Sequence, residues 1–159
     1  VGDLFLRAKA NLLGDDGGNV GLAISPFIKV PTASRGLGNG AVEAGVAALL
    51  QVSLPDNWSL NFDPELDALE NAAGDGRHLN SIAVVSLNRP VSKTVTLSGE
   101  VWSDVDFDPA GRQTQVSADV GAAWIPAKVP TLQLDGGVNF GLNRATPGVQ
   151  VYVGISKRF

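Results

Sequence analysis

Apolar and polar side chains alternate along most of this chain, one residue at a time. In the stretch 148–159, valine, isoleucine and phenylalanine occupy odd positions, and small or polar residues occupy even ones. Successive side chains of a strand point to opposite faces, so this stretch predicts a strand with one apolar and one polar face. Lys157 is the exception on the apolar face, where its ammonium could reach out to a membrane interface.

The same alternation recurs upstream and predicts an all-β fold. The apolar face is ambiguous only in 79–87, where we favour the odd positions. No segment keeps a helical period. Each stretch is near the ~9–11 residues that cross a bilayer at a tilt. The pattern therefore predicts an antiparallel up-and-down meander of about nine strands, forming a transmembrane β-barrel or part of one. These strands are 4–12, 20–30, 42–52, 58–68, 79–87, 95–107, 114–124, 132–142 and 149–159.

Turn-forming residues separate these stretches, including 14–18, 55–57, 71–78 and 88–90. Two prolines, Pro26 and Pro64, instead fall inside predicted strands, on the apolar face. A proline removes one hydrogen-bond donor from the ladder, so each should mark a bulge or a local break.

The composition agrees with such a chain. Its 159 residues are enough for one domain, 18% are charged and the mean hydropathy is +0.11. The absence of cysteine excludes disulfides and thiolate metal sites. A net charge of −4 argues against a nucleic-acid partner. Because bacterial barrels usually have an even number of strands, we expect 1–159 to be a single barrel domain that lacks amino-terminal strands of a longer protein.

Several local motifs occur in a fixed order. They are Gly2-Asp3-Leu4 with Arg7 and Lys9, then Lys29–Ala33, Gly36–Gly40 and Val153–Phe159. In this order they resemble the phenol-degradation (MetA-pathway) transporter family of outer-membrane β-barrels, over essentially the whole chain. The resemblance implies a location in the bacterial outer membrane, contact with its lipid, and passive passage of small hydrophobic or aromatic solutes.

The carboxy-terminal strand is the expected assembly signal. In bacterial barrels the last strand commonly ends on an aromatic residue that the barrel assembly machinery recognises. The residues that would carry this signal here are Val153, Gly154, Ile155 and Phe159.

In a barrel the polar face would line a lumen. The candidate lumen-lining residues are Arg7, Lys9, Lys29, Glu43, Asp63, Glu65, Asp67, Glu100, Asp104, Asp119 and Asp135, and Asp3, Asp106 and Arg158 share this face. Such charges either pair across the lumen and plug it, which we weigh slightly higher, or create a field that favours cations or polar solutes. The ladder Asp63, Glu65 and Asp67 is the best candidate for function, with a merely solvated face as its alternative.

Aromatic residues suggest where the membrane interfaces lie. Trp58, Trp124 and Phe159 fall on the apolar face near strand ends, consistent with one aromatic girdle, and Phe107 is a candidate for the other. Ordinary core packing is the alternative. Trp102 does not fit this scheme, because the alternation places it on the polar face.

The sequence offers no enzyme site. His78 is the only histidine, and near Ser81 it lacks the orienting group and oxyanion site that a hydrolase needs. We expect it to be a solvated loop residue, and we expect no cofactor and no metal. Asp75-Gly76 reads as a turn rather than a calcium site.

Two other functions compete with transport. One is a structural outer-membrane barrel with a plugged lumen. The other is a soluble, lipocalin-like binder of small molecules, whose apolar face would point inward. Alternation does not say which face is inside. Three features favour the membrane: the terminal aromatic, the small residues on the polar face and the aromatics at strand ends.

Overall fold

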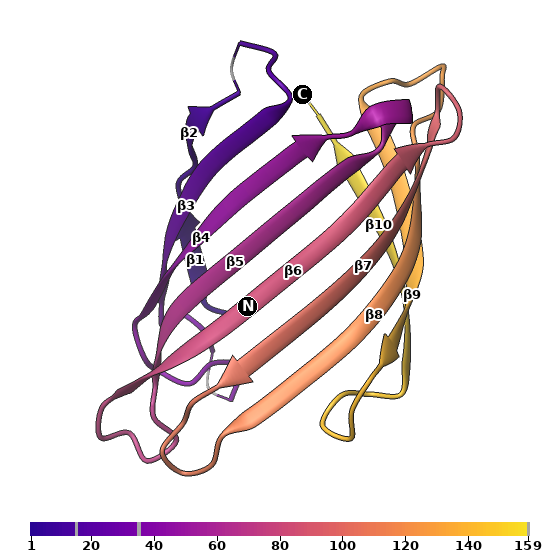
Figure 1. The fold of residues 1–159 in the computed structure, drawn as a ribbon. Helices are drawn as coiled ribbons and strands as arrows, with labels where there is room; N and C mark the ends of the chain where they lie inside the picture. Colours follow the sequence, from indigo (N-terminus) through magenta and orange to yellow (C-terminus); the bar gives the residue numbers. More distant parts are fainter. Residues whose placement is uncertain (15, 35, 159) are drawn as a thin grey trace. The chain divides into compact units, whose positions relative to one another are not determined.

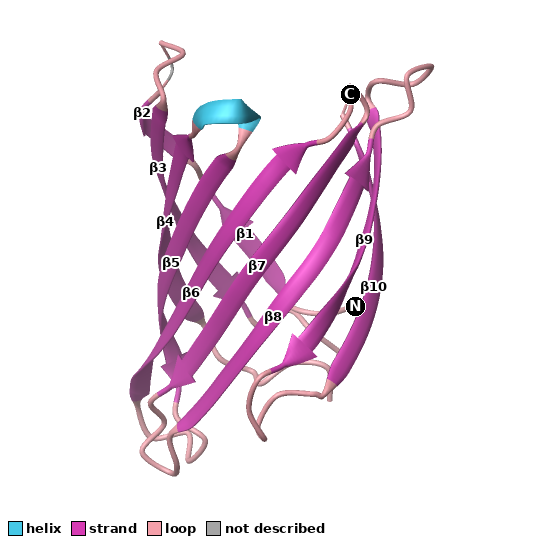
Figure 2. Cartoon of the chain, turned by 45° about the vertical axis from the view of Figure 1, so that its right-hand side comes forward, coloured by secondary structure: helices cyan, strands magenta, loops and turns pink. Residues whose placement is uncertain are grey.

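The computed structural model describes residues 1–14, 16–34 and 36–158. Strands dominate this part of the chain, and its helical element is the short turn η1 (Pro55–Asn57), drawn in cyan in Figure 2. None of the described helices has the length and apolar character needed to span a membrane. The fold is therefore all-β, as the alternation predicts.

The described strands follow each other as an antiparallel meander (Figure 1). They form a ten-stranded sheet in the order β1-β3-β4-β5-β6-β7-β8-β9-β10, with β2 paired to β3. Within the described residues β1 and β10 are the two edges of this order, so the sheet is not closed. The strands are β1 (Leu4–Arg7), β2 (Ala10–Leu13), β3 (Val20–Val30), β4 (Glu43–Ser53), β5 (Ser59–Glu70), β6 (Arg77–Pro90), β7 (Val95–Asp106), β8 (Gln113–Trp124), β9 (Leu132–Gly141) and β10 (Val149–Lys157).

The one added strand arises because the first predicted strand is divided into β1 and β2. Both pair with β3, Arg7 opposite Phe27 and Ala10 opposite Ile24. The break falls opposite Pro26, whose carbonyl accepts the amide of Ala8 at 3.1 Å but whose nitrogen has no hydrogen to donate in return. The predicted break at Pro26 thus occurs in the partner strand.

Other boundaries differ in detail. β5 continues through Pro64, so of the two alternatives predicted there, a bulge or a local break, the break does not occur. β6 runs to Pro90, beyond the turn expected at 88–90, and the chain reverses at 91–94 instead. A register shift between Asn11 and Leu13 marks a bulge in β2.

The chain divides into two compact units, each made of parts of several strands. Unit 1 comprises Val1–Leu50, Asp63–Ala83 and Asp104–Thr114, and unit 2 comprises Gln51–Phe62, Val84–Ser103 and Gln115–Phe159. In unit 1 the buried apolar residues are three alanines, whereas Ser25, Lys29, Glu43, Asp67 and Asn80 are all buried. In unit 2 the buried residues Ser86 and Ser117 are likewise polar.

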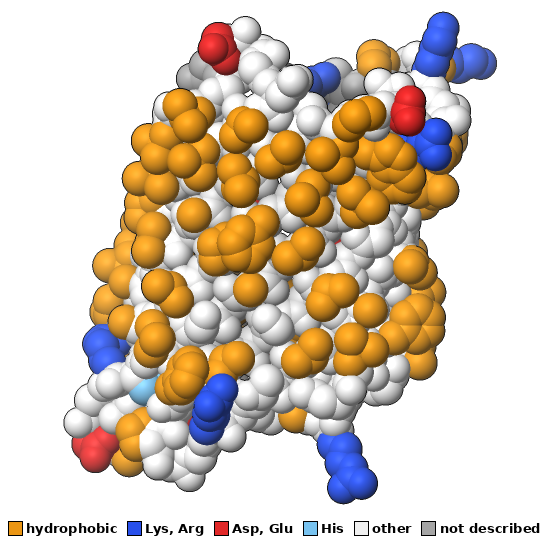
Figure 3. Space-filling view, viewed as in Figure 1, with side chains coloured by type: hydrophobic (Ala, Val, Ile, Leu, Met, Phe, Trp, Pro, Cys, Tyr) orange, Lys and Arg blue, Asp and Glu red, His pale blue; other side chains and the backbone are white. Residues whose placement is uncertain are grey.

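The large apolar side chains are exposed. Val120, Val151 and Val153 are 57%, 74% and 87% exposed. Figure 3 shows one face covered mainly by apolar side chains, with the visible charged side chains near strand ends and loops. In β6 the odd residues Leu79, Val85 and Leu87 are exposed, which confirms the register favoured for that strand. Buried polar residues and exposed apolar residues reverse the burial pattern of a water-soluble protein.

Candidate functional site

The polar face of unit 1 holds a buried ion network around Lys29 of β3. Its ammonium lies 2.6 Å from the Glu43 carboxylate and 3.6 Å from that of Asp3. It also donates to the side-chain carbonyl of Asn39 at 2.6 Å, and the Asn39 amide donates to Glu43 at 2.7 Å. The three charged side chains are at most 11% exposed. This network joins β3, β4 and the segment between them. It favours the first of the two alternatives for the polar-face charges, namely that they pair with one another.

A second ion pair crosses the polar face of unit 1. The Arg7 guanidinium of β1 lies 3.2 Å from the Glu65 carboxylate of β5, although β3 and β4 separate the two strands in the sheet order. The guanidinium also stacks on Phe27, 4.8 Å from the ring centre, and Phe27 contacts Phe5. Lys9 interacts electrostatically with Asp63. The bases of the first predicted strand thus face the acidic ladder of β5.

Three polar side chains in unit 1 keep buried oxygens without a hydrogen-bond partner. They are Oδ1 of Asp67, Asn80 and Asp104, on β5, β6 and β7. Side-chain hydrogen bonds join Asn80 to both carboxylates. Asp67 and Asn80 are each 5% exposed. This acidic centre is defined as Asp67, Asn80 and Asp104, and it contains more negative charge than its own hydrogen bonds compensate.

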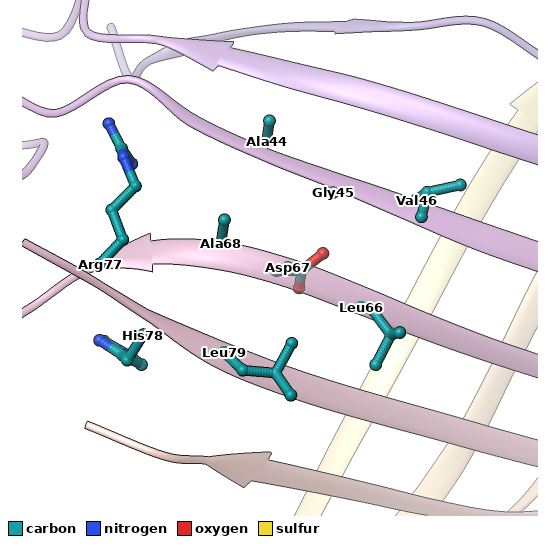
Figure 4. A pocket seen from close by; sticks show the side chains of 9 residues that line it. All are labelled: Ala44, Gly45, Val46, Leu66, Asp67, Ala68, Arg77, His78 and Leu79. Atoms are coloured by element: carbon teal, nitrogen blue, oxygen red, sulfur yellow. The ribbon is translucent and has the colours of Figure 1, made fainter. Parts of the chain in front are cut away.

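Gly45 of β4 makes room for the acidic centre. A Cβ atom at this position would collide with Oδ1 of Asp67 and would lie 2.5 Å from the Phe27 ring. A shallow groove of about 520 Å³ passes beside this point. Figure 4 shows Asp67 between the small residues Ala44, Gly45 and Ala68, flanked by Leu66 and Leu79.

His78 is not the solvated loop residue that the sequence suggested. Its side chain is 5% exposed, with Nε2 2.9 Å from the Asp106 carboxylate and Nδ1 3.0 Å from the Asn71 side-chain carbonyl. Asp108 lies 3.7 Å from Nδ1. The sequence places His78 beside a loop, but pairing of β6 with β7 brings acidic residues from the far end of β7 onto it. The imidazole therefore joins two neighbouring loops instead of facing water.

Asp108 fastens the 71–76 loop to the segment after β7. Its carboxylate accepts the amides of Ala110 and Ala72, each at 2.7 Å. These hydrogen bonds to the charged form, together with His78, lower the pKa of Asp108 below its ordinary value of 3.8. Asn71 and Asp75 are also bonded within this loop, in agreement with a turn.

We expect the contacts of Asp108 to survive mild acid. A lowered pKa means that they contribute stability above pH 3.8 and lose it as the pH falls through the lower folded value. In Asp108→Asn this acid transition should disappear, and the Ala72 amide should be less protected at neutral pH. Amide chemical shifts of Ala72 and Ala110 followed against pH measure both effects. A transition of the Ala72 amide at or above the ordinary pKa would contradict the assignment.

The polar face of unit 2 carries fewer charges. The Tyr152 hydroxyl donates to Asp119 at 3.1 Å, and the Gln133 amide donates to Asp135 at 3.4 Å. Gly154 of the predicted assembly signal lies opposite Asp135, and a Cβ atom there would collide with the Asp135 carboxylate. Glu100 lines a cavity beside Trp102. The predicted lumen-lining acids of unit 2 therefore lie on the expected face.

Of the predicted interface aromatics that the structure describes, Phe107 and Trp124 are exposed and Trp58 is half-buried. Phe107 and Trp124 are 40% and 47% exposed, so neither packs in a core. The Arg112 and Arg89 guanidiniums stack on Phe107 and Trp58, at 4.8 Å and 5.1 Å from the ring centres. Phe159 lies outside the described residues, and its predicted roles in the girdle and the assembly signal stay predictions. Val153 and Ile155 are strongly exposed on β10.

Residue types alone did not reveal several members of these clusters. Phe5, Phe27, Asn39, Asn80 and His78 share the polar face with the predicted charges but are absent from the predicted set. For Phe5, Phe27, Asn80 and His78 the available signal was their parity along the strands, whereas Asn39 lies between β3 and β4 and has no such signal. Among the described residues, no group of three or more histidine, aspartate or glutamate side chains is arranged to hold a metal ion.

The whole chain matches a known protein family. A family model described as "Putative MetA-pathway of phenol degradation" covers residues 1–159. No curated protein and no solved structure matches the chain.

Proposed function

Since this chain belongs to the family of the "Putative MetA-pathway of phenol degradation", we propose that it forms part of an outer-membrane β-barrel for passive passage of small hydrophobic or aromatic solutes. In this proposal the apolar face contacts lipid and the polar face lines the lumen. Lipid and the barrel assembly machinery are its partners, and no covalent chemistry is involved.

The reversed burial pattern is the observation that carries this proposal. Water-soluble proteins bury valine, leucine and isoleucine and expose charges. Here Val120, Val151 and Val153 are exposed, whereas Lys29, Glu43 and Asp67 are buried. Each strand of the meander from β3 to β10 has 9 to 14 residues, close to the ~9–11 of a tilted transmembrane strand. A lipocalin-like binder would need the opposite orientation of the two faces.

The second candidate is a structural barrel with a plugged lumen. The buried Lys29 network and the Arg7–Glu65 pair favour it, because they fill the polar face of unit 1 with paired charges. The two candidates share a membrane location and differ in solute flux.

Vesicle swelling distinguishes the candidates. The full-length protein that contains this chain is refolded into lipid vesicles, which are diluted into an isotonic solution of the aromatic solute phloroglucinol. Transport predicts faster swelling with the protein than with empty vesicles. Insertion without faster swelling would support the plugged barrel instead.

Labelling of single cysteines tests the orientation of the two faces. The chain has no cysteine, so Val138→Cys and Asn139→Cys each introduce one thiol, at adjacent positions of β9. In vesicles we expect a membrane-impermeant thiol reagent to modify residue 139 and to spare residue 138, which would face lipid. Equal reaction at both positions, or a protein that stays soluble without lipid, would overturn the membrane assignment.

A further inference from the structure

A groove lies on the apolar face of unit 2, between the start of β5 and the neighbouring ends of β6 and β7. Its volume is about 350 Å³, and its walls include Leu87, Val91 and Leu97, all of them exposed. Gly99 also lines it, and a Cβ atom at this position would meet nothing within 4 Å, so the space beside Leu97 stays open. The face that we propose to contact lipid therefore contains a hollow with apolar walls.

The groove changes character along the strands. Arg89 is the penultimate residue of β6, and it lines the groove together with Trp58, which directly precedes β5. Leu87 on β6, and Leu97 and Gly99 on β7, lie further from the strand ends. Tryptophan is enriched at membrane interfaces, and leucine is favoured in the hydrocarbon core. This order matches a lipid whose headgroup lies at the strand ends and whose acyl chain follows the groove.

Arg89 is a cation on the apolar face. Its odd position places it on the same face as the exposed residues Val85 and Leu87. The guanidinium stacks on Trp58, 5.1 Å from the ring centre. Stacking occupies the flat side of the guanidinium and leaves the N–H donors of its edge, which bind phosphate in a bidentate manner. Within the described parts of the chain no carboxylate pairs with Arg89, so an anionic ligand would complete its contacts.

Basic residues predominate around this end of the groove. The antiparallel order brings the turns after β4, β6 and β8 to the same strand ends, and a backbone hydrogen bond of 2.8 Å joins the last two turns. These turns contain the exposed residues Lys93 and Lys128 and one acid, Asp56. Figure 3 shows lysine and arginine side chains gathered at the upper right of the apolar face, beside an acidic one. Together with Arg89 the balance is positive, which favours an anionic headgroup over a zwitterionic one.

We propose that this groove is a specific site for one anionic phospholipid. The phosphate binds to the edge of the Arg89 guanidinium, and one acyl chain fills the groove over Gly99. Such a site differs from the general contact of the apolar face with lipid, because it has a fixed place and a preferred headgroup. The inference rests on the proposed function only for the membrane location, and it holds for an open and for a plugged barrel.

Native mass spectrometry measures lipid binding. The full-length protein that contains this chain is delipidated in detergent micelles and mixed with dioleoyl phosphatidylglycerol, which is anionic, or dioleoyl phosphatidylcholine, which is zwitterionic. We expect a first phosphatidylglycerol to bind at lower concentration than any further lipid, and roughly tenfold more tightly than phosphatidylcholine. Equal binding of the two lipids would overturn the proposal, as would gradual uptake of phosphatidylglycerol without a tighter first molecule.

Two variants locate the site. Arg89→Gln removes the charged donor and should weaken the first phosphatidylglycerol roughly tenfold, the contribution of one hydrogen bond to a charged group. Gly99→Leu leaves the charge unchanged but fills the groove, and should weaken the same lipid. The matched controls are Arg144→Gln, which removes an exposed arginine after β9, and Ala122→Leu, which adds a leucine to the apolar face of β8 outside the groove. Unchanged binding in either Arg89→Gln or Gly99→Leu would overturn the assignment.

Two further outcomes separate this inference from its alternatives. Saturable binding of inorganic phosphate that is lost in Arg89→Gln and kept in Gly99→Leu would assign the site to a free anion instead of a lipid. A full-length protein that stays soluble without lipid would refute the proposed membrane function. A protein that inserts into vesicles but shows no preferred phosphatidylglycerol would refute the lipid site and leave the proposed function standing.

Discussion

Replacing Lys29 by methionine is expected to destabilise the chain by about 3–5 kcal/mol, the usual cost of removing one partner of a buried ion pair. Methionine retains the length of the side chain but leaves Glu43 and Asp3 without their shared cation. Both carboxylates are almost inaccessible to water, and the Asn39 side-chain carbonyl loses one of its two donors, keeping only the Ala41 amide. The free energy of unfolding, measured by urea denaturation of the protein in detergent micelles or lipid, gives the effect.

Arg7→Met is the matched control. Arg7 also pairs with a glutamate on the same face of unit 1, but its side chain is 48% exposed. An exposed ion pair contributes roughly 0–1 kcal/mol, so this variant should lose much less stability. Lys29→Met/Glu43→Gln should recover part of the loss by removing one uncompensated charge. Equal losses in the two single variants would show that burial of the Lys29 network does not determine its contribution.

Alternation predicted the strands because it records a local property. Side chains of a strand point alternately to its two faces. An alternation of polar and apolar residues therefore reveals a strand wherever one face is polar and the other apolar. It succeeded even for β6, where two registers competed. It failed at the first strand, because the break there depends on Pro26 in a different strand. The hydrogen-bond donor that proline lacks is missing from the neighbouring strand. Which strand is the neighbour cannot be predicted from the sequence pattern of either strand alone.

The clusters could be predicted only in part, for a related reason. Odd or even position along the strands predicted that Lys29, Glu43, Arg7 and Glu65 share one face. It did not predict which of these side chains contact each other. The Arg7–Glu65 pair joins strands separated by two others, and only the arrangement of unit 1 in space brings them together. Neutral members such as Asn39 carry no distinctive signal, because asparagine is common in turns and on polar faces.

Trp102 shows that an exception to a pattern can be more informative than the pattern. The sequence of β7 alone does not explain an aromatic residue on its polar face. Its neighbours in the cavity come from three other strands and a loop. A misfit residue is where we expect function to override the local rule.

Replacing Asp67 and Asp104 together by asparagine is expected to reduce the preference of the proposed channel for cations. All three side chains of the acidic centre retain a buried oxygen without a partner, and repulsion between its carboxylates favours a passing cation. Glu65 is a poorer target, although it belongs to the same ladder, because its charge already pairs with Arg7. Of the ladder Asp63, Glu65 and Asp67 proposed from the sequence, the structure therefore retains Asp67 as the candidate for cation preference. It adds Asp104 from β7.

The reversal potential in a salt gradient across a planar bilayer measures this preference. We expect it to move toward zero in Asp67→Asn/Asp104→Asn, with stability retained, because the amides keep their size and relieve the repulsion between like charges. Asp56→Asn is the control, since Asp56 lies in η1 with an exposed side chain. An unchanged reversal potential would show that the acidic centre does not determine the cation preference. A bilayer with inserted protein and no conductance would favour the plugged barrel, because the paired charges of unit 1 would then close the lumen as well as stabilise it.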